Sequence, residues 1–180
     1  MNAIVIRSAR RILLTVGVFS ALLCMLVVAF LALQFACGHP SDARLARGFY
    51  SYESEFNELV RMTEIDFPIY RIAFDFSFPA DRLSARRWDD YRARFSTLGI
   101  SMGISKPLGG DYTLFLASAN GLFGRGSSKG YVFSHSELSP CVSDMELEGY
   151  EPPHWAVDNN LQWVVYKPLK EHWYLYYEFR

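Results

Sequence analysis

The sequence predicts an α+β protein, in which an N-terminal transmembrane helix precedes a single domain with two amphipathic helices packed on a mostly antiparallel sheet. Three observations lead to this prediction. Residues 12–33 form an apolar run without a charged side chain. Residues 52–63 and 84–98 place apolar side chains at helical spacing. Later segments alternate apolar and polar residues with the period of two that is typical of strands.

The charge distribution argues against nucleic acid as a partner. The chain has 180 residues, 18 of them basic and 19 acidic, and it contains no long basic tract. Nucleic-acid-binding proteins usually carry a concentrated basic patch, which is missing from this composition. Residues 39–180 hold 15 basic and 19 acidic side chains. That length suits one domain with a core of its own.

The apolar run from Ile12 to Leu33 is 22 residues long. As a helix it would span about 33 Å, which is close to the ~30 Å thickness of a bilayer's hydrocarbon core. We therefore expect residues 12–36 to be an uncleaved signal anchor in contact with the lipid bilayer. Two alternatives stay open, namely cleavage near the small residues 36–38 and lipidation of Cys37.

The charges that flank this run predict its orientation. Three arginines precede it and two follow it: Arg7, Arg10, Arg11, Arg44 and Arg47. Because cationic flanks tend to stay in the cytoplasm, we expect residues 1–11 to be a short cytoplasmic N-terminus. The rest of the chain would then lie outside the membrane, which in a bacterium is the periplasmic side of the inner membrane.

Turn-rich residues separate the expected anchor from the expected domain. Residues 37–48 are polar and predict a juxtamembrane linker, with the start of a helix near Leu45 as an open alternative, so the extracytoplasmic domain would occupy residues 49–180. Ser51 is the expected N-cap of the first helix, and Gly99 is the expected end of the second. The main strands are expected at residues 70–78, 112–118, 130–134, 162–166 and 172–179.

Aromatic side chains are abundant outside the expected anchor, with 26 among residues 39–180. Most of them are expected to fill the core. Tyr and Trp need partners for their polar ends and are enriched at binding hot spots. We therefore expect an exposed subset near the C-terminus to form a contact surface: Trp155, Trp163, Trp173, Tyr174 and Tyr176.

The segment from Gly121 to Gly130 is rich in glycine and serine and superficially resembles a phosphate-binding loop. It lacks the Lys-Ser/Thr pair that directly follows the last glycine of a nucleotide-binding P-loop. Successive backbone amides, together with Arg125, Ser127, Ser128 and Lys129, would make an anion site. The alternative is a flexible hairpin loop.

The sequence offers no catalytic residue, metal site or cofactor site that can be assigned. Four histidines lack the spacing of metal ligands: His39, His135, His154 and His172. A hydrolase that uses Ser134 or His135 stays open, because the members of a triad need not be neighbours in sequence. A disulfide between Cys37 and Cys141 also stays open.

Two segments in the C-terminal third of the chain are similar to segments of other proteins. Residues 127–134 (SSKGYVFS) together with residues 173–177 (WYLYY) resemble small uncharacterised bacterial proteins that are often membrane-anchored or exported. The resemblance covers the last third of the chain, and it implies no activity, ligand or catalytic residue.

These observations together predict a single-pass inner-membrane protein whose periplasmic domain binds another envelope macromolecule, most simply a protein, without catalysis. An immunity-like blocker and an envelope assembly factor would both fit. Two alternatives remain, an envelope hydrolase and a small-ligand sensor. A sensor would have to act through a partner across the bilayer, because a cytoplasmic segment of residues 1–11 is too short for an output domain.

Overall fold

The computed structural model describes Gly17 and residues 20–28, 38–107, 109–122, 125–151, 154 and 161–179. The chain divides into two compact units, Met1–Gly38 and His39–Arg180. In the first unit, residues 20–28 are helical. Among the described residues, no helix combines the length and the apolar character needed to cross a bilayer. Most of the expected anchor, residues 12–36, lies outside the described part of the chain, and so does Cys37.

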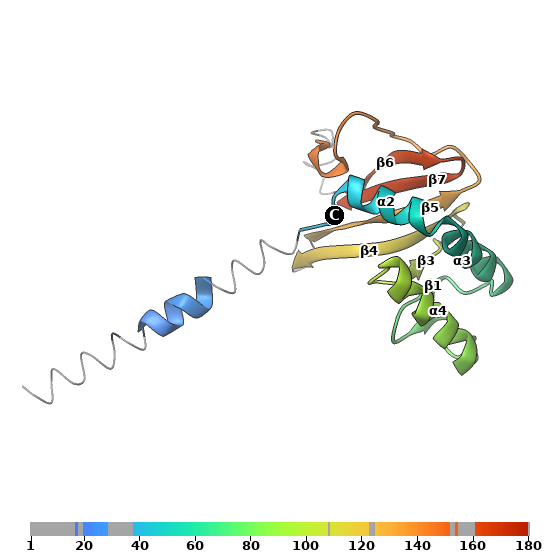
Figure 1. The fold of residues 1–180 in the computed structure, drawn as a ribbon, viewed down its shortest axis with the longest axis horizontal. Helices are drawn as coiled ribbons and strands as arrows, with labels where there is room; N and C mark the ends of the chain where they lie inside the picture. The colour runs from blue at the N-terminus through green and yellow to red at the C-terminus, as the bar shows by residue number, and fades with distance from the viewer. Residues whose placement is uncertain are drawn as a thin grey trace, which may run out of the picture. The chain divides into compact units, whose positions relative to one another are not determined.

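The second unit is an α+β domain built on one antiparallel sheet (Figure 1). Its elements are α2 (Asp42–Ser51), α3 (Glu53–Ile65), β1 (Arg71–Ile72), β2 (Ser77–Phe78), α4 (Ala85–Leu98), β3 (Ile104–Ser105), β4 (Tyr112–Leu122), β5 (Arg125–Ser134), the 3-10 turn η1 (Leu147–Gly149), β6 (Trp163–Lys170) and β7 (Trp173–Phe179). The strand order is β2-β1-β3-β4-β5-β7-β6, with antiparallel pairing throughout. The predicted fold class of this part of the chain is confirmed.

Helix α2 occupies most of the segment that was expected to be a linker. The Ser41 side chain accepts a hydrogen bond from the first turn and caps the helix. Leu45 and Phe49 are buried, with 5% and 0% of their surfaces exposed. The folded domain therefore begins at His39 and not at residue 49. Leu45 and Phe49 are enough to make this polar stretch part of the folded domain, because both pack on the sheet.

The two predicted helices are confirmed. In α4 the Ser84 hydroxyl accepts from the Arg87 amide at 3.2 Å, and Gly99 ends the helix in the left-handed region with a φ of 67°. The N-cap of α3 is Tyr52. The expected cap, Ser51, instead forms the last residue of α2.

The predicted strand over residues 70–78 is wrong in detail. The chain reverses after Ala73, whose amide donates to the Phe76 carbonyl at 2.8 Å. Two short strands, β1 and β2, result, and Ile72 pairs with Ser77. Phe78, expected on a half-buried face, is 58% exposed.

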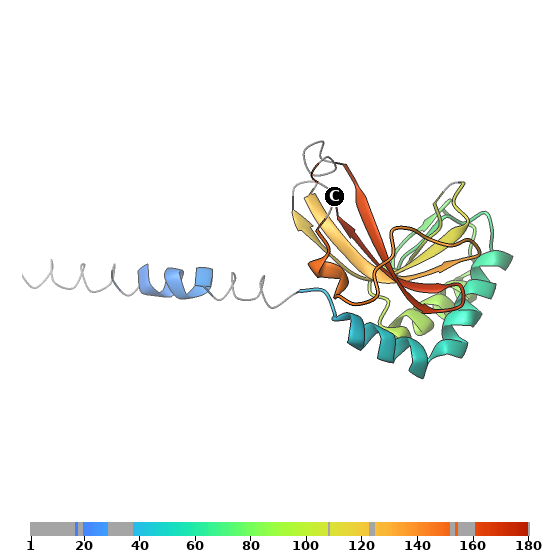
Figure 2. The same cartoon turned by 90° about the horizontal axis from the view of Figure 1, so that it is seen from above.

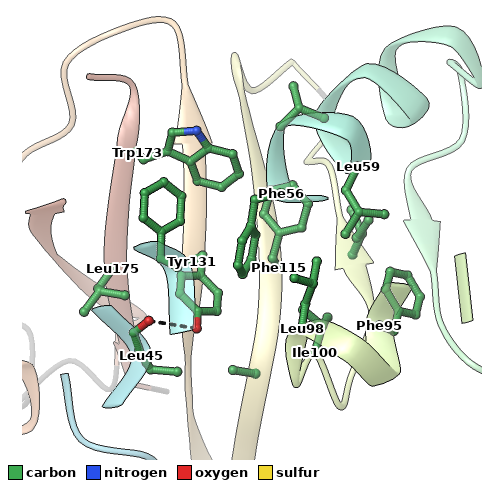
Figure 3. Close-up of a cluster of buried hydrophobic side chains, with 14 of the residues drawn as sticks. Leu45, Phe56, Leu59, Phe95, Leu98, Ile100, Phe115, Tyr131, Trp173 and Leu175 are labelled. Carbon is green, nitrogen blue, oxygen red and sulfur yellow. Dashed lines mark hydrogen bonds between the residues drawn. The ribbon is translucent and has the colours of Figure 1, made fainter. Parts of the chain in front are cut away.

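One face of the sheet is covered by the three helices (Figure 2). Aromatic side chains make much of this contact (Figure 3). The Phe56 ring of α3 lies 4.5 Å from Tyr131 and 5.6 Å from Trp173, measured between ring centroids. The Phe115 ring is 5.4 Å from Trp173. The Tyr131 hydroxyl donates to the Leu45 carbonyl at 3.1 Å, which joins β5 to α2 (Figure 3).

The opposite face of the sheet, called the open face below, carries a smaller apolar cluster. No helix among the described residues covers it (Figure 2). Its buried members are Val132, Tyr166 and Tyr176, and half-buried side chains around them include Tyr112, Leu114, Leu116 and Tyr174. The alternation of side chains along each strand explains why β5 and β7 contribute to both faces.

A buried ion cluster holds the start of α2 against the sheet. Lys129 Nζ lies 2.8 Å from Asp42 Oδ1 and 2.9 Å from Glu148 Oε1. The side chains of Lys129 and Asp42 are 0% and 4% exposed. Lys167 Nζ lies 3.1 Å from Asp42 Oδ2. Burial by itself would lower the pKa of Lys129, but hydrogen bonds and charges from Asp42 and Glu148 outweigh burial and raise that pKa.

Replacing Lys129 with Met is expected to destabilise the domain by about 3–5 kcal/mol, because Asp42 stays buried with less compensation for its charge. The double variant Asp42→Asn/Lys129→Met should lose less stability than the sum of the two single variants. Urea unfolding of residues 39–180 measures both effects. Lys170→Met is the control, since its ion pair with Glu53 is exposed. A Lys129→Met loss as small as the control's, under about 1 kcal/mol, would contradict the expectation.

Candidate functional site

A cavity of about 360 Å³ lies on the open face. We call it the open-face pocket. Its lining comes from β1, β4, β5 and β7 and includes Arg71, Leu116, Asn120, Ser127, Ser128 and Glu178. Strands β1 and β7 are far in sequence from the β4–β5 hairpin, and it is the pairing of the sheet that brings their side chains to one place.

Arg71 brings a positive charge to this pocket. Its neighbour Ile72 is 1% exposed in the core, so alternation along β1 turns Arg71 to the open face. Arg71 Nη2 donates to the Met102 carbonyl at 2.8 Å. Burial lowers the pKa of Arg71, and nearby Tyr176 opposes that shift. No carboxylate in the described part of the chain lies within ion-pair distance of this guanidinium.

The Met102 carbonyl, which accepts from Arg71, is held in place because the chain at Gly103 approaches β1 closely. A Cβ at Gly103 would come within 2.0 Å of the Ile72 carbonyl oxygen, and Gly103 has a φ of 79°. Only glycine fits such a contact and such a torsion without strain. The carbonyl of Met102 is thereby fixed beside β1.

Glu178 brings a negative charge to the same pocket from β7. Only 8% of its surface is exposed. Its Oε2 accepts from the Ser128 hydroxyl at 3.0 Å, and its Oε1 accepts from the Gln162 amide. These donors hold the carboxylate in one orientation. The pocket therefore contains a fixed cation and a fixed anion, an arrangement suited to recognising a charged or polar ligand.

His39 fastens the first residues of the domain to the β4–β5 hairpin. Its Nδ1 and Nε2 each lie 2.7 Å from a serine hydroxyl, of Ser118 and Ser127 respectively. The ring also packs edge-on against Tyr177. A triad histidine would bond to a carboxylate on the side away from its serine. Among the described residues His39 bonds to hydroxyls on both sides, which indicates a structural clamp.

The stability that His39 contributes to the domain depends on pH, and the lowered pKa of His39 gives the direction of that dependence. Burial lowers the pKa of His39 below its ordinary value of 6.5; Lys129 acts in the same direction, and Glu148 opposes it. The unfolded chain therefore binds this proton more readily than the folded one, so the stabilisation is complete above pH 6.5 and is lost as pH falls below it.

We expect the His39→Gln variant to lose about 1 kcal/mol at neutral pH, because a hydrogen bond is broken. The loss relative to wild type should shrink as the pH is lowered through and below 6.5. Denaturant unfolding of residues 39–180 over that range measures it. His154→Gln, at an exposed histidine, serves as the control. A difference between wild type and His39→Gln that is constant with pH would contradict the assignment.

Three of the four residues of the predicted anion site make other contacts. Strands β4 and β5 are separated only by residues 123 and 124, so the expected long loop is instead a hairpin of paired strands. Lys129 is buried against Asp42. Ser127 bonds to His39 and Ser128 to Glu178. Arg125 begins β5, and its side chain lies outside the described part of the structure.

The predicted aromatic surface is only partly available. Trp173 is 3% exposed and Tyr176 is 0% exposed, so the expectation of exposure is wrong for these two. Trp173 packs in the main core, and Tyr176 is buried in the small apolar cluster of the open face. Trp163 is half-buried and stacks on Tyr150. Tyr174 is half-buried on the open face. Trp155 lies outside the described residues. A role in binding stays a prediction for this set.

A second cavity, of about 490 Å³, contains His135, Ser136 and His172 in its lining. The Ser134 hydroxyl beside it donates to the Ser136 carbonyl at 2.8 Å. His172 Nδ1 lies 3.1 Å from the Ser134 carbonyl oxygen and not beside the Ser134 hydroxyl. His135 lies 3.8 Å from Glu64. The described contacts thus give Ser134 no histidine base, and the hydrolase alternative has no geometric support there.

Comparison with known proteins adds no functional assignment: no family model, curated protein or solved structure matches the chain. Within the described residues, no group of three or more His, Cys, Asp and Glu side chains is placed to hold a metal ion. The function therefore has to be argued from the site.

Sequence reasoning missed Arg71, Asn120 and Glu178. A weak signal existed for two of them. Arg71 lies on the polar side of the predicted strand over residues 70–78, and Glu178 is an acid inside the aromatic C-terminal strand. Neither signal indicates that the two side chains share a cavity.

Proposed function

We propose that the chain is a single-pass membrane protein of the bacterial envelope. In this proposal residues 12–36 anchor it, and residues 39–180 form a non-enzymatic binding domain on the periplasmic side. The anchor is supported by the 22-residue uncharged run and by the arginines that precede it. The domain is a compact unit of its own, as a tethered binding module requires.

The observation that carries the binding role is the open-face pocket. It contains a half-buried arginine without a carboxylate partner among the described residues, together with Glu178, which neighbouring side chains orient. A half-buried charge is costly unless it is paired, and a ligand group would supply that pairing for Arg71. The second cavity is a weaker candidate, because carboxylates already lie near its charged groups, as with Lys170 and Glu53.

The partner in this proposal is another envelope macromolecule that inserts a short segment into the open-face pocket. Tethering both molecules to one compartment raises their effective concentration, so a small contact is enough. A small-ligand sensor is the second candidate, and the size of the cavity favours it: about 360 Å³ falls in the range of sites for small molecules.

The orientation can be tested with topology reporters at the C-terminus of the full chain. A reporter active only outside the cytoplasm should be active, and a cytoplasm-specific reporter should be inactive. Intact-mass measurement of the membrane-extracted protein should give the full chain of 20.7 kDa. Recovery of the chain as a soluble cytoplasmic species would remove the membrane proposal.

The binding role can be tested by site-specific photo-crosslinking in cells. A crosslinking residue in place of Ser105, which pairs with Arg71 in the sheet, should give an adduct of defined mass. The same residue in place of Arg47 on α2 is the matched control and should not. Arg71→Met should strongly reduce the Ser105 adduct. An adduct that is unchanged by Arg71→Met, or equally strong from position 47, would place the contact elsewhere.

A further inference from the structure

We propose that the open-face pocket binds the carboxyl-terminal end of a peptide chain whose last residue is apolar, with the terminal carboxylate on Arg71. The inference rests on the proposed binding function and names the chemistry that the pocket recognises. Three features support it: the fixed arginine, the acidic side chain in the same cavity and the apolar side chains on the same face.

The guanidinium of Arg71 is positioned before any ligand arrives. Its contact with the Met102 carbonyl at 2.8 Å fixes the direction of the planar group. The remaining N–H donors of the guanidinium are suited to two parallel hydrogen bonds with a carboxylate. Because the side chain is half-buried, such a pair is screened less by water than a surface pair. An anionic group is therefore the ligand feature that this side chain selects.

Glu178 limits how much negative charge the ligand can bring. It lines the same cavity, and like charges in one site disfavour each other. A phosphate monoester carries a charge of about −1.5 to −2 at neutral pH, whereas a carboxylate carries a single charge. The pair of Arg71 and Glu178 therefore favours a carboxylate over a phosphate.

The remaining lining fits the end of a peptide. Leu116 lines the cavity, and Leu114 and Tyr112 are half-buried on the same face, so an apolar side chain next to the carboxylate has a surface to pack on. Asn120 also lines the cavity, and the Ser128 hydroxyl, which donates to Glu178, can still accept a hydrogen bond from a peptide amide. Terminal carboxylates are a recurrent target of peptide-binding domains. A volume of about 360 Å³ admits a chain end and excludes a folded surface.

Calorimetric titration of residues 39–180, the unit that contains the whole core, tests the inference. The probe is an N-acetylated tripeptide ending in leucine, as the free acid and as the matched amide. The acid should bind at least about tenfold more tightly, which corresponds to about 1.4 kcal/mol. Arg71→Met should abolish this difference. The control Arg47→Met, at an exposed arginine of α2, should preserve it.

Two further probes test whether the pocket selects a peptide carboxylate or binds any small anion. Inorganic phosphate and acetate should compete weakly with the peptide acid on the wild-type domain, and Glu178→Gln should strengthen phosphate relative to the peptide. Circular dichroism confirms that each variant is folded before it is titrated.

Several results would overturn the inference. They are no binding of the peptide acid, equal binding of acid and amide, an acid–amide difference that persists in Arg71→Met, and tighter binding of phosphate or acetate than of the peptide. If any of these occurred while the Ser105 crosslink in cells still required Arg71, the pocket would remain the binding site and only the proposed ligand class would fall.

Discussion

The buried cluster around Lys129 is the interaction on which the rest of the domain depends. It joins four separate elements, since Asp42 begins α2, Lys129 lies in β5, Glu148 lies in η1 and Lys167 lies in β6. A buried ion pair adds little net stability compared with an apolar packing, but a broken one is very costly. The cluster therefore favours one arrangement of these elements over others. That arrangement sets where the folded domain starts, three residues before Asp42, and holds β5, which helps line the open-face pocket.

The aromatic richness of the chain reflects the use of both faces of one sheet. In β7, Trp173 and Leu175 pack on the helices, whereas Tyr174, Tyr176 and Glu178 belong to the open face. A strand that is apolar on both sides is usual in sheets covered on both faces. Here the second face carries only a small apolar cluster and then a charged cavity. Tyr176 of this cluster lies close enough to Arg71 to influence its pKa, so the apolar cluster adjoins the charged cavity.

Sequence patterns predicted the elements whose signals lie within their own segment. They did not predict the features that depend on contacts between residues far apart in the chain. Helix α4 has its signals within its own segment, from Ser84 to Gly99, so its limits were predictable. Helix α2 was not, because its buried residues are few and its start is held by Lys129, far along the chain. The local sequence instead predicts Lys129 as part of an anion site, since nothing in it reveals Asp42 and Glu148 beside this side chain. The open-face pocket needs four strands in the correct order, and no local pattern encodes that order.

The binding role proposed for the pocket depends on two oriented charges and not on a reacting group. Catalysis requires a nucleophile or a base that meets the reacting atoms, with its partners aligned. Arg71 and Glu178 instead hold opposite charges in fixed positions, while the hydroxyls of Ser127 and Ser128 are bonded to His39 and Glu178. Oriented charges of both signs discriminate between ligands more than they add affinity. In the proposed function, a weak but selective site would be sufficient, because confinement to one membrane would raise the effective concentration of the partner and the pocket would provide the selectivity.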